Sequence, residues 1–174
     1  MSVLPENMIN YMAYLDGETF VGTANIELPS LDQLTEKVKG AGIAGEVEAP
    51  VMGHFDVLTL GITWRTITPE AMALAAPGAH ALDFRGSQQN YDAASGTYSY
   101  VPVKVVVRAT PKKTSLGKMA VAGQTDTKNE LEVIYLKVYI DGRETLELDK
   151  YNFIYRVMGV DYLAEVRQSL GLDY

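Results

Sequence analysis

Within the stretch from Asp56 to Thr66, apolar residues recur at every second position from Leu58 to Trp64. The apolar set on even positions is Leu58, Leu60, Ile62 and Trp64, and the odd positions hold Thr59, Gly61, Thr63 and Arg65. A period of two sends successive side chains to opposite faces of an extended chain. The pattern therefore predicts a strand with one fully apolar face.

The segment before this strand is uncharged and rich in small residues. It reads Gly40-Ala41-Gly42-Ile43-Ala44-Gly45, and it indicates a flexible loop that contacts other copies of the chain. Upstream, Leu31–Val38 has two interpretations. Ser30 could cap a short helix there, or the segment could be one arm of a long hairpin. We favour the extended form.

Two Asp-Gly pairs predict tight hairpins, because both residues tolerate the positive φ of a type I′ turn. Asp16-Gly17 joins strands expected over Ile9–Leu15 and Thr19–Leu28, and Asp141-Gly142 joins Leu131–Ile140 and Arg143–Val157. Pro29 ends the second of these strands by removing a backbone donor.

Two further strands are expected over His80–Gln89 and Thr97–Thr110. In the longer one, a face of Val101, Val103, Val105, Val107 and Ala109 opposes a face of Tyr98, Tyr100, Lys104 and Arg108. Pro102 predicts that this strand lies at a sheet edge. Pro111–Asn129, with Lys112 and Lys113, reads as a polar connection.

Helix signals are few. Thr68-Pro69-Glu70 starts a short helix that Pro77-Gly78 ends, and Asp161 is expected to cap Tyr162–Leu170 before Gly171. With at least seven strands, the chain is predicted to be one mainly β domain over residues 1–174. We expect two packed antiparallel sheets, as a sandwich or open barrel, with a short flanking helix and a C-terminal helix.

Composition narrows the possible chemistry. The chain has 174 residues, no cysteine and a net charge of −7, which excludes thiolate chemistry and disfavours ordinary DNA binding. No signal peptide, lipid anchor or membrane-spanning run is recognised, so the protein is expected to be made in the cytoplasm.

The sequence contains no recognised catalytic motif. His54 and His80 lack ligand spacing, and the glycines of the small-residue segment run into Glu46 and Glu48, which disfavour a phosphate. We therefore predict no catalytic, cofactor-binding or metal site, no cofactor and no enzyme. An enzyme with scattered carboxylates stays a lesser alternative.

Three stretches carry a family resemblance. LPSL, GAGIAGEVEAPVMGHFDVLTLGITWRT and YIDGRETLELDKYNFIYRVMGVDYLAEVRQSLGL occur in this order. From about Ile9 to Leu172 the chain resembles the major tail tube protein of contractile-tailed bacteriophages, a family related to type VI secretion and bacteriocin tubes.

The resemblance implies a structural virion protein with a ring-forming fold. Six subunits would form a ring whose inner sheets join into a barrel, and stacked rings would form the hollow tail tube. Sheath contraction would drive this tube through the host envelope, and the genome would pass inside it. The implied partners are other copies of the chain, the tail sheath, a tape measure protein in the lumen, baseplate and tail terminator proteins, and DNA in transit without specific binding.

These expectations assign provisional sites. Inter-subunit loops are expected near residues 30–53 and 111–129, and the acidic balance suits a lumen that repels phosphates. The candidate contact residues are Leu31, Leu34, Gly40, Ala41, Gly42, Ile43, Ala44 and Gly45, and the lumen-facing candidates are Glu132, Glu144 and Glu147. The alternatives are a carbohydrate- or protein-binding β-sandwich that uses Tyr98 and Tyr100, and the tube of a headless contractile bacteriocin.

Overall fold

A computed structural model describes residues 3–20 and 23–172 of the chain. Within these ranges the chain is mainly β, with two short helices. The strands are β1 (Val3–Leu15), β2 (Glu18–Phe20), β3 (Thr23–Glu27), β4 (Gln33–Val38), β5 (Val47–Phe55), β6 (Thr59–Trp64), β7 (His80–Asp92), β8 (Thr97–Ser115), β9 (Thr127–Ile140), β10 (Arg143–Asp149), β11 (Ile154–Val157) and β12 (Val160–Asp161); the helices are α1 (Pro69–Ala73) and α2 (Ala164–Ser169).

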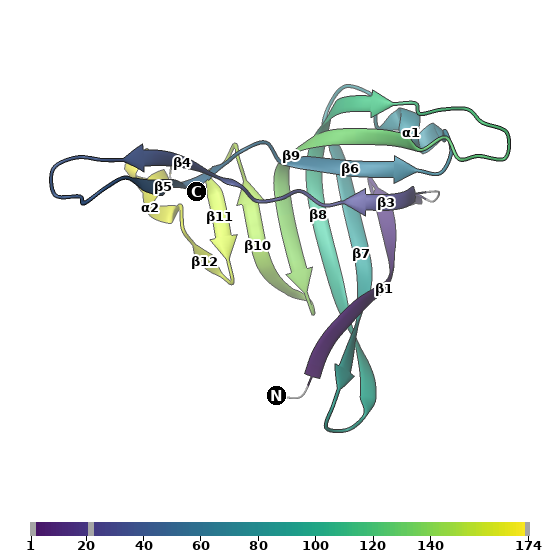
Figure 1. Ribbon diagram of the computed structural model, residues 1–174, viewed down its shortest axis with the longest axis horizontal. Helices are drawn as coiled ribbons and strands as arrows, with labels where there is room; N and C mark the ends of the chain where they lie inside the picture. Colours follow the sequence, from purple (N-terminus) through teal and green to yellow (C-terminus); the bar gives the residue numbers. More distant parts are fainter. Residues whose placement is uncertain (1–2, 21–22, 173–174) are drawn as a thin grey trace.

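One large antiparallel sheet organises the molecule. Its strands follow the order β12-β11-β10-β9-β8-β7-β1-β2 (Figure 1). The long strand β9 divides the sheet into two branches, because β6 pairs with residues 127–132 and β10 pairs with residues 135–140. β3 pairs with β6 and completes the second branch.

The β3–β6 ribbon folds over the inner face of the sheet and closes the core. The predicted alternation is confirmed, since Leu58, Leu60, Ile62 and Trp64 are at most 1% exposed. They pack against Leu82, Val107 and other apolar residues of β7, β8 and β9. The observed architecture confirms the predicted mainly β, two-layer fold.

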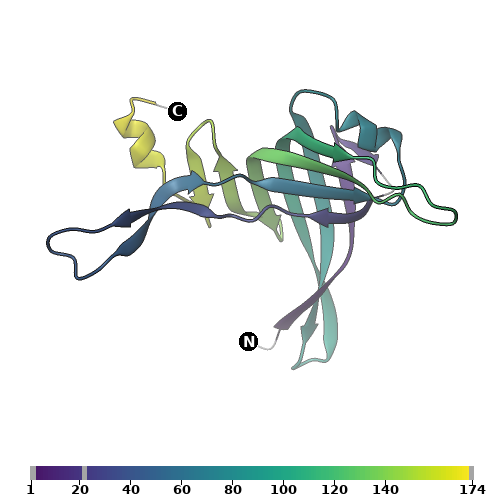
Figure 2. The same ribbon diagram turned by 45° about the horizontal axis from the view of Figure 1, so that its top comes forward.

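Beyond the body, the chain continues as a two-stranded ribbon. β4 pairs with β5 in a sheet of its own, and this β4–β5 arm projects away from the core in both views (Figures 1 and 2). The extended interpretation of Leu31–Val38 is thereby confirmed for its β4 part.

Both predicted Asp-Gly turns form. Asp16 and Gly17 have φ values of 50° and 85°, and Asp141 and Gly142 have 52° and 73°, as a type I′ turn requires. The helix start is also confirmed, because the Thr68 hydroxyl accepts a hydrogen bond from the Ala71 backbone N–H.

The prediction that Pro102 marks an edge strand is wrong. β8 lies between β7 and β9, but pairing with β9 begins only at Val103. The carbonyl of Pro102 accepts from Asp141 N–H at the hairpin turn. In an antiparallel strand the N–H and the C=O of one residue face the same neighbouring strand. The side of Pro102 that lacks an N–H donor therefore faces the end of β9, where no ladder hydrogen bond is lost.

Several predicted boundaries also need correction. The stretch expected as one strand over Arg143–Val157 is two strands, β10 and β11, separated by a turn after Asp149. The connection expected over residues 111–129 is shorter, because β8 continues to Ser115 and β9 begins at Thr127. β8 can pass Pro111 because its pairing with β9 is irregular between Pro111 and Lys113.

The C-terminal helix α2 is shorter than predicted. Its N-cap residue is Leu163 rather than Asp161. Asp161 instead accepts a hydrogen bond from Leu163 N–H and pairs with Arg167. Leu163 is buried and lies over Gly53 at the base of the β4–β5 arm, so α2 packs against that base.

Candidate assembly surfaces

The β4–β5 arm has one mainly apolar face that covers nothing within the subunit. Val38 lies directly opposite Val47 in the pairing register, and strand alternation places Leu34 and Val51 on the same face. These four apolar side chains are between 40% and 54% exposed. The face also holds Ala49 and, opposite it, one charged residue, Glu36. An isolated two-stranded ribbon is marginally stable in water, so this apolar face needs a partner.

Charged residues occupy the opposite face of the arm. Lys37 and Glu48 lie opposite each other in the register, and Lys37 and Lys39 both reach Glu46 at the tip, at 3.9 and 4.0 Å. Because these pairs are exposed, each contributes little stability. The arm is therefore amphipathic across its two faces.

The small-residue segment forms the tip of the arm, as expected. Ile43 N–H donates to the Gly40 carbonyl, and Gly45 N–H donates to the Ile43 carbonyl, both at 3.2 Å. Gly40, Gly42 and Gly45 have positive φ values, which glycine adopts without strain. The structure thus places Ile43 at an exposed tip, and Leu31 and Leu34 are exposed near the arm's base.

A second projection leaves the body at the end opposite to the arm (Figures 1 and 2). It is the loop 116–126, whose neck is fixed by Lys118 N–H donating to the Thr125 carbonyl and Thr125 N–H donating to the Arg65 carbonyl. At its tip, Met119 and Val121 are almost fully exposed.

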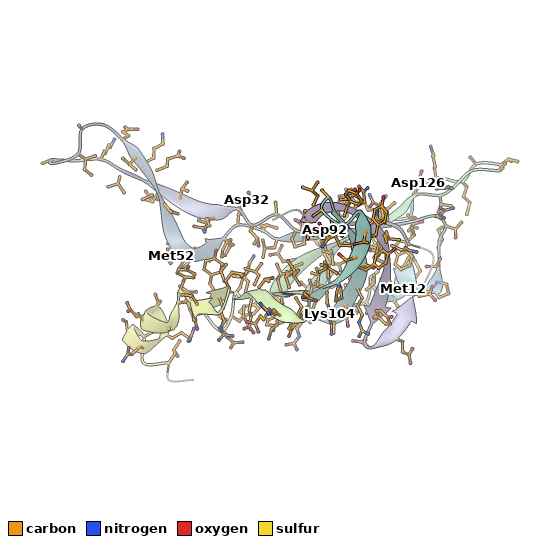
Figure 3. The ribbon with its side chains drawn as sticks, turned by 90° about the horizontal axis from the view of Figure 1, so that it is seen from below. Met12, Asp32, Met52, Asp92, Lys104 and Asp126 are labelled. Carbon is orange, nitrogen blue, oxygen red and sulfur yellow. The ribbon has the colours of Figure 1, made fainter. Side chains whose placement is uncertain are left out.

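The face of the large sheet that points away from the core carries a row of paired charges. We call it the charge ladder; it runs across the strands from β1 to α2 through Tyr14, Arg85, Asp83, Lys104, Tyr139, Lys137, Glu144, Glu147, Arg156, Asp161 and Arg167. Figure 3 shows Lys104 on this face, on the side of the molecule away from the arm.

In the β7–β8 half of the ladder the cations Arg85 and Lys104 are exposed, whereas the side chain of Asp83 is only 19% exposed. Asp83 accepts from Arg85 at 2.8 Å and lies 3.5 Å from Lys104. The Arg85 guanidinium lies 4.4 Å from the centre of the Tyr14 ring, within the range of a cation–π contact. Hydrogen bonding to Asp83 raises the pKa of Arg85.

The β9–β11 half is better shielded. Lys137 donates to Glu144 at 2.9 Å and also lies 3.8 Å from Glu147, and Arg156 contacts both carboxylates. The bond from Lys137 lowers the pKa of Glu144. Burial, followed by its hydrogen bond to Glu147, raises the pKa of Tyr135 to about 12.

The three acidic candidates for the lumen are therefore neutralised locally. Glu144 and Glu147 belong to the charge ladder, and Glu132 accepts from Lys150 at 3.0 Å on the other half of β9. Their exposure to a lumen stays a prediction.

His80 and Tyr98, which the sequence offered as candidates for binding or catalysis, make contacts within the subunit. His80 Nε2 lies 2.9 Å from the Ala76 carbonyl, after α1, and the Tyr98 ring packs on Tyr91 across the strands. Within residues 3–20 and 23–172, no group of three His, Asp or Glu side chains could hold a metal ion. In the same ranges, no helix is long and apolar enough to span a membrane.

Sequence reasoning missed two features of these surfaces. Val38, Val47 and Val51 lie inside the inter-subunit loop expected near residues 30–53 but were not named as contact residues, although their alternation with Lys37 and Glu48 is visible in the sequence. The charge ladder could not be foreseen, because its members come from strands whose register only the fold defines.

The architecture matches that of a known contractile-tail component. One chain of the cryo-EM structure titled "an Extracellular Contractile Injection System, PVC sheath/tube terminator in extended state" superposes with a TM-score of 0.53. The match covers 78% of this chain and 96% of that one at 10% identity, so it concerns the fold alone. The chain thus shares its fold with a component of that contractile injection system.

Sequence comparison identifies the family. Residues 5–171 match the family described as phage tail tube protein FII. The tail tube protein of Escherichia phage P2 is 30% identical over 176 residues, covering 97% of this chain and 99% of the relative. The chain belongs to the phage tail tube protein FII family, and as such it is a structural component of a virion tail.

Proposed function

We propose that the chain forms hexameric rings that stack into the hollow inner tube of a contractile tail. The tube would be driven through the host envelope when the sheath contracts, and the genome would pass along it. Membership of the tail tube family supports this function, and the amphipathic β4–β5 arm is the observation that carries it.

Stacking follows from the asymmetry of the subunit. The arm projects from one end, and a different surface lies at the other end (Figure 1). A contact between two different surfaces is heterologous, and it repeats into a filament when its rotation does not close a ring. We propose that the arm and the loop 116–126 both lie between subunits of the tube.

Ring closure would use the ends of the large sheet. β12 and β2 are the terminal strands of its main path, and both are short. Joining such ends around a ring removes exposed edges and produces a continuous barrel.

The charge ladder is the proposed wall of the lumen. On this face Asp83, Glu144 and Glu147 each have a cationic partner, so the wall would offer little unpaired charge to DNA phosphates. The pairing of these charges, together with the acidic net charge of the chain, supports passage of DNA without specific binding. A tape measure protein would occupy the same lumen before ejection.

The other proposed partners lie outside the wall. The sheath would surround the tube, and the baseplate and the terminator would hold its two ends.

The Ile43→Asp variant tests the stacking role of the arm. A carboxylate at the tip would have to be buried in an apolar contact, which costs on the order of 2 kcal/mol or more per contact. Negative-stain electron microscopy should show tubes from the wild type and short or absent tubes from the variant. Tubes of normal length from Ile43→Asp would contradict the assignment of the tip to the ring-to-ring contact.

A further inference from the structure

The subunit leaves part of its inner sheet face uncovered. β3 lies at the border of the covering ribbon, and β1, β7 and β8 continue past it (Figure 1). Among the described strands β3 pairs only with β6, so its other edge offers free backbone N–H and C=O groups beside the uncovered sheet.

A groove of about 200 Å³ lies at this border and is mostly apolar. Its residues come from β1, from the end of β3, and from β7 and β8: Met8, Tyr11, Ile26, Leu28, Phe84, Gly86, Val103 and Val105. Met8 and Leu28 are about half exposed, at 48% and 53%. The groove therefore combines an apolar floor with a free strand edge.

The arm has the complementary features. It continues the same ribbon, because β3 leads into β4 and β5 leads into β6. In the body the ribbon buries its apolar face on the sheet, whereas in the arm the face of Leu34, Val38, Val47 and Val51, which also carries Glu36, has no sheet beneath it. The β4–β5 arm thus extends beyond the sheet of its own subunit, and part of the sheet formed by β1, β7 and β8 is not covered by the β3–β6 ribbon.

We propose that the groove beside β3 receives the β4–β5 arm of a second copy of this chain. The arm would lie along the free edge of β3, extend the covering layer by strand addition, and place its apolar face on Met8, Tyr11 and Val103. The arm cannot reach this groove in its own subunit, because it projects away from the body (Figures 1 and 2).

This docking rests on the proposed tube function and specifies one of its contacts. It is heterologous, since an arm meets a groove, and each subunit supplies one of each. Both apolar surfaces would leave water together, which is the main driving force of stable association.

A matched pair of variants tests the groove. Met8→Asp places a carboxylate on its floor, whereas Met12→Asp changes a methionine of the same strand with similar exposure, 45% against 48%. Met12 lies opposite Arg85 in the register and belongs to the other face of the sheet. We expect Met8→Asp to raise the concentration needed for tube formation at least tenfold and Met12→Asp to leave it near the wild-type value, with circular dichroism showing that both subunits fold.

Cross-linking tests the occupant directly, because the chain has no native cysteine. In assembled tubes, Val47→Cys combined with Met8→Cys should form disulfides under mild oxidation or react with a short bismaleimide. A heterologous contact should produce a ladder of covalent oligomers on a denaturing gel. Val47→Cys combined with Tyr100→Cys, on the opposite face of the sheet, should remain monomeric.

The outcomes separate the docking from the proposed function. Suppose that the wild type forms tubes. The docking is then overturned, and the tube function kept, if Met8→Asp also forms normal tubes or if neither reagent cross-links positions 47 and 8. A wild-type chain that forms neither rings nor tubes would overturn the proposed function itself.

Discussion

At the scale of single residues, a few polar side chains connect elements that are distant in the sequence. Asn129 is buried on β9, where it accepts from Trp64 Nε1 at 2.8 Å and donates to the Ala71 carbonyl and to Thr114. It joins β6, α1 and β8 at one point. Such a residue looks like an ordinary strand asparagine in the sequence, because its partners are set by tertiary packing.

Asp161 connects the last strand of the sheet to α2. Its carboxylate accepts from Arg167 Nη2 at 2.7 Å, and both side chains are largely shielded. Changing Asp161→Asn should lower the free energy of unfolding of the subunit by about 2 kcal/mol near pH 7, because a charged hydrogen bond is lost. Urea denaturation measures this difference, and Asp16→Asn, in an exposed turn, is the control.

The Asp161–Arg167 pair also predicts how the stability of the folded subunit depends on pH. The bond from Arg167 lowers the pKa of Asp161 below its ordinary value of 3.8. The stabilisation is therefore present above about pH 4 and is lost as the pH falls through the lower value of the folded state. The wild type and Asp161→Asn should differ least under the most acidic conditions in which both still fold, and a difference that grows there would contradict the assignment.

At the scale of elements, α2 supports the base of the arm. Gly53 in β5 has a φ of 73°, and a Cβ at that position would lie 2.5 Å from Leu163 Cδ1. Leu163 is itself buried, so it cannot turn aside freely. The glycine permits close approach of the helix to the strand.

The Gly53→Ala variant should therefore lower the free energy of unfolding by about 2–4 kcal/mol, from backbone strain and overpacking together. Gly159→Ala is a suitable control, because Gly159 has a φ of 85° and its Cβ would meet nothing within 4 Å. The control isolates the strain, expected near 1 kcal/mol. Equal losses from the two variants, measured by chemical denaturation, would contradict the role of the Leu163 contact.

Elements whose residues alternate regularly could be predicted from the sequence. Features that depend on how one strand pairs with another could not. The alternation from Leu58 to Trp64 is a local property, and it defined both the strand and its buried face. The interior position of Pro102 depends on where β9 ends, which no local pattern contains. The turn between β10 and β11 was missed for a similar reason, since Asp149 caps it through hydrogen bonds to Tyr151 and Asn152 N–H.

At the scale of the whole molecule, the distribution of apolar surface indicates a subunit that is completed by its neighbours. The core of the body is buried, yet the arm and the strip of sheet beyond β3 both expose apolar side chains. A monomer that remained alone would keep both surfaces in water. The candidate sites at the arm tip could be predicted from composition, whereas the groove needs strands far apart in the sequence to be brought together.

The central claim is that these chains stack through their arms into a hollow tube. Cryo-electron microscopy of the purified protein tests it most directly. We predict stacked rings with sixfold symmetry, an open lumen lined by the charge ladder, and every β4–β5 arm buried between copies. A discrete monomer at all concentrations tried, or a filament whose arms remain in solvent, would contradict the account.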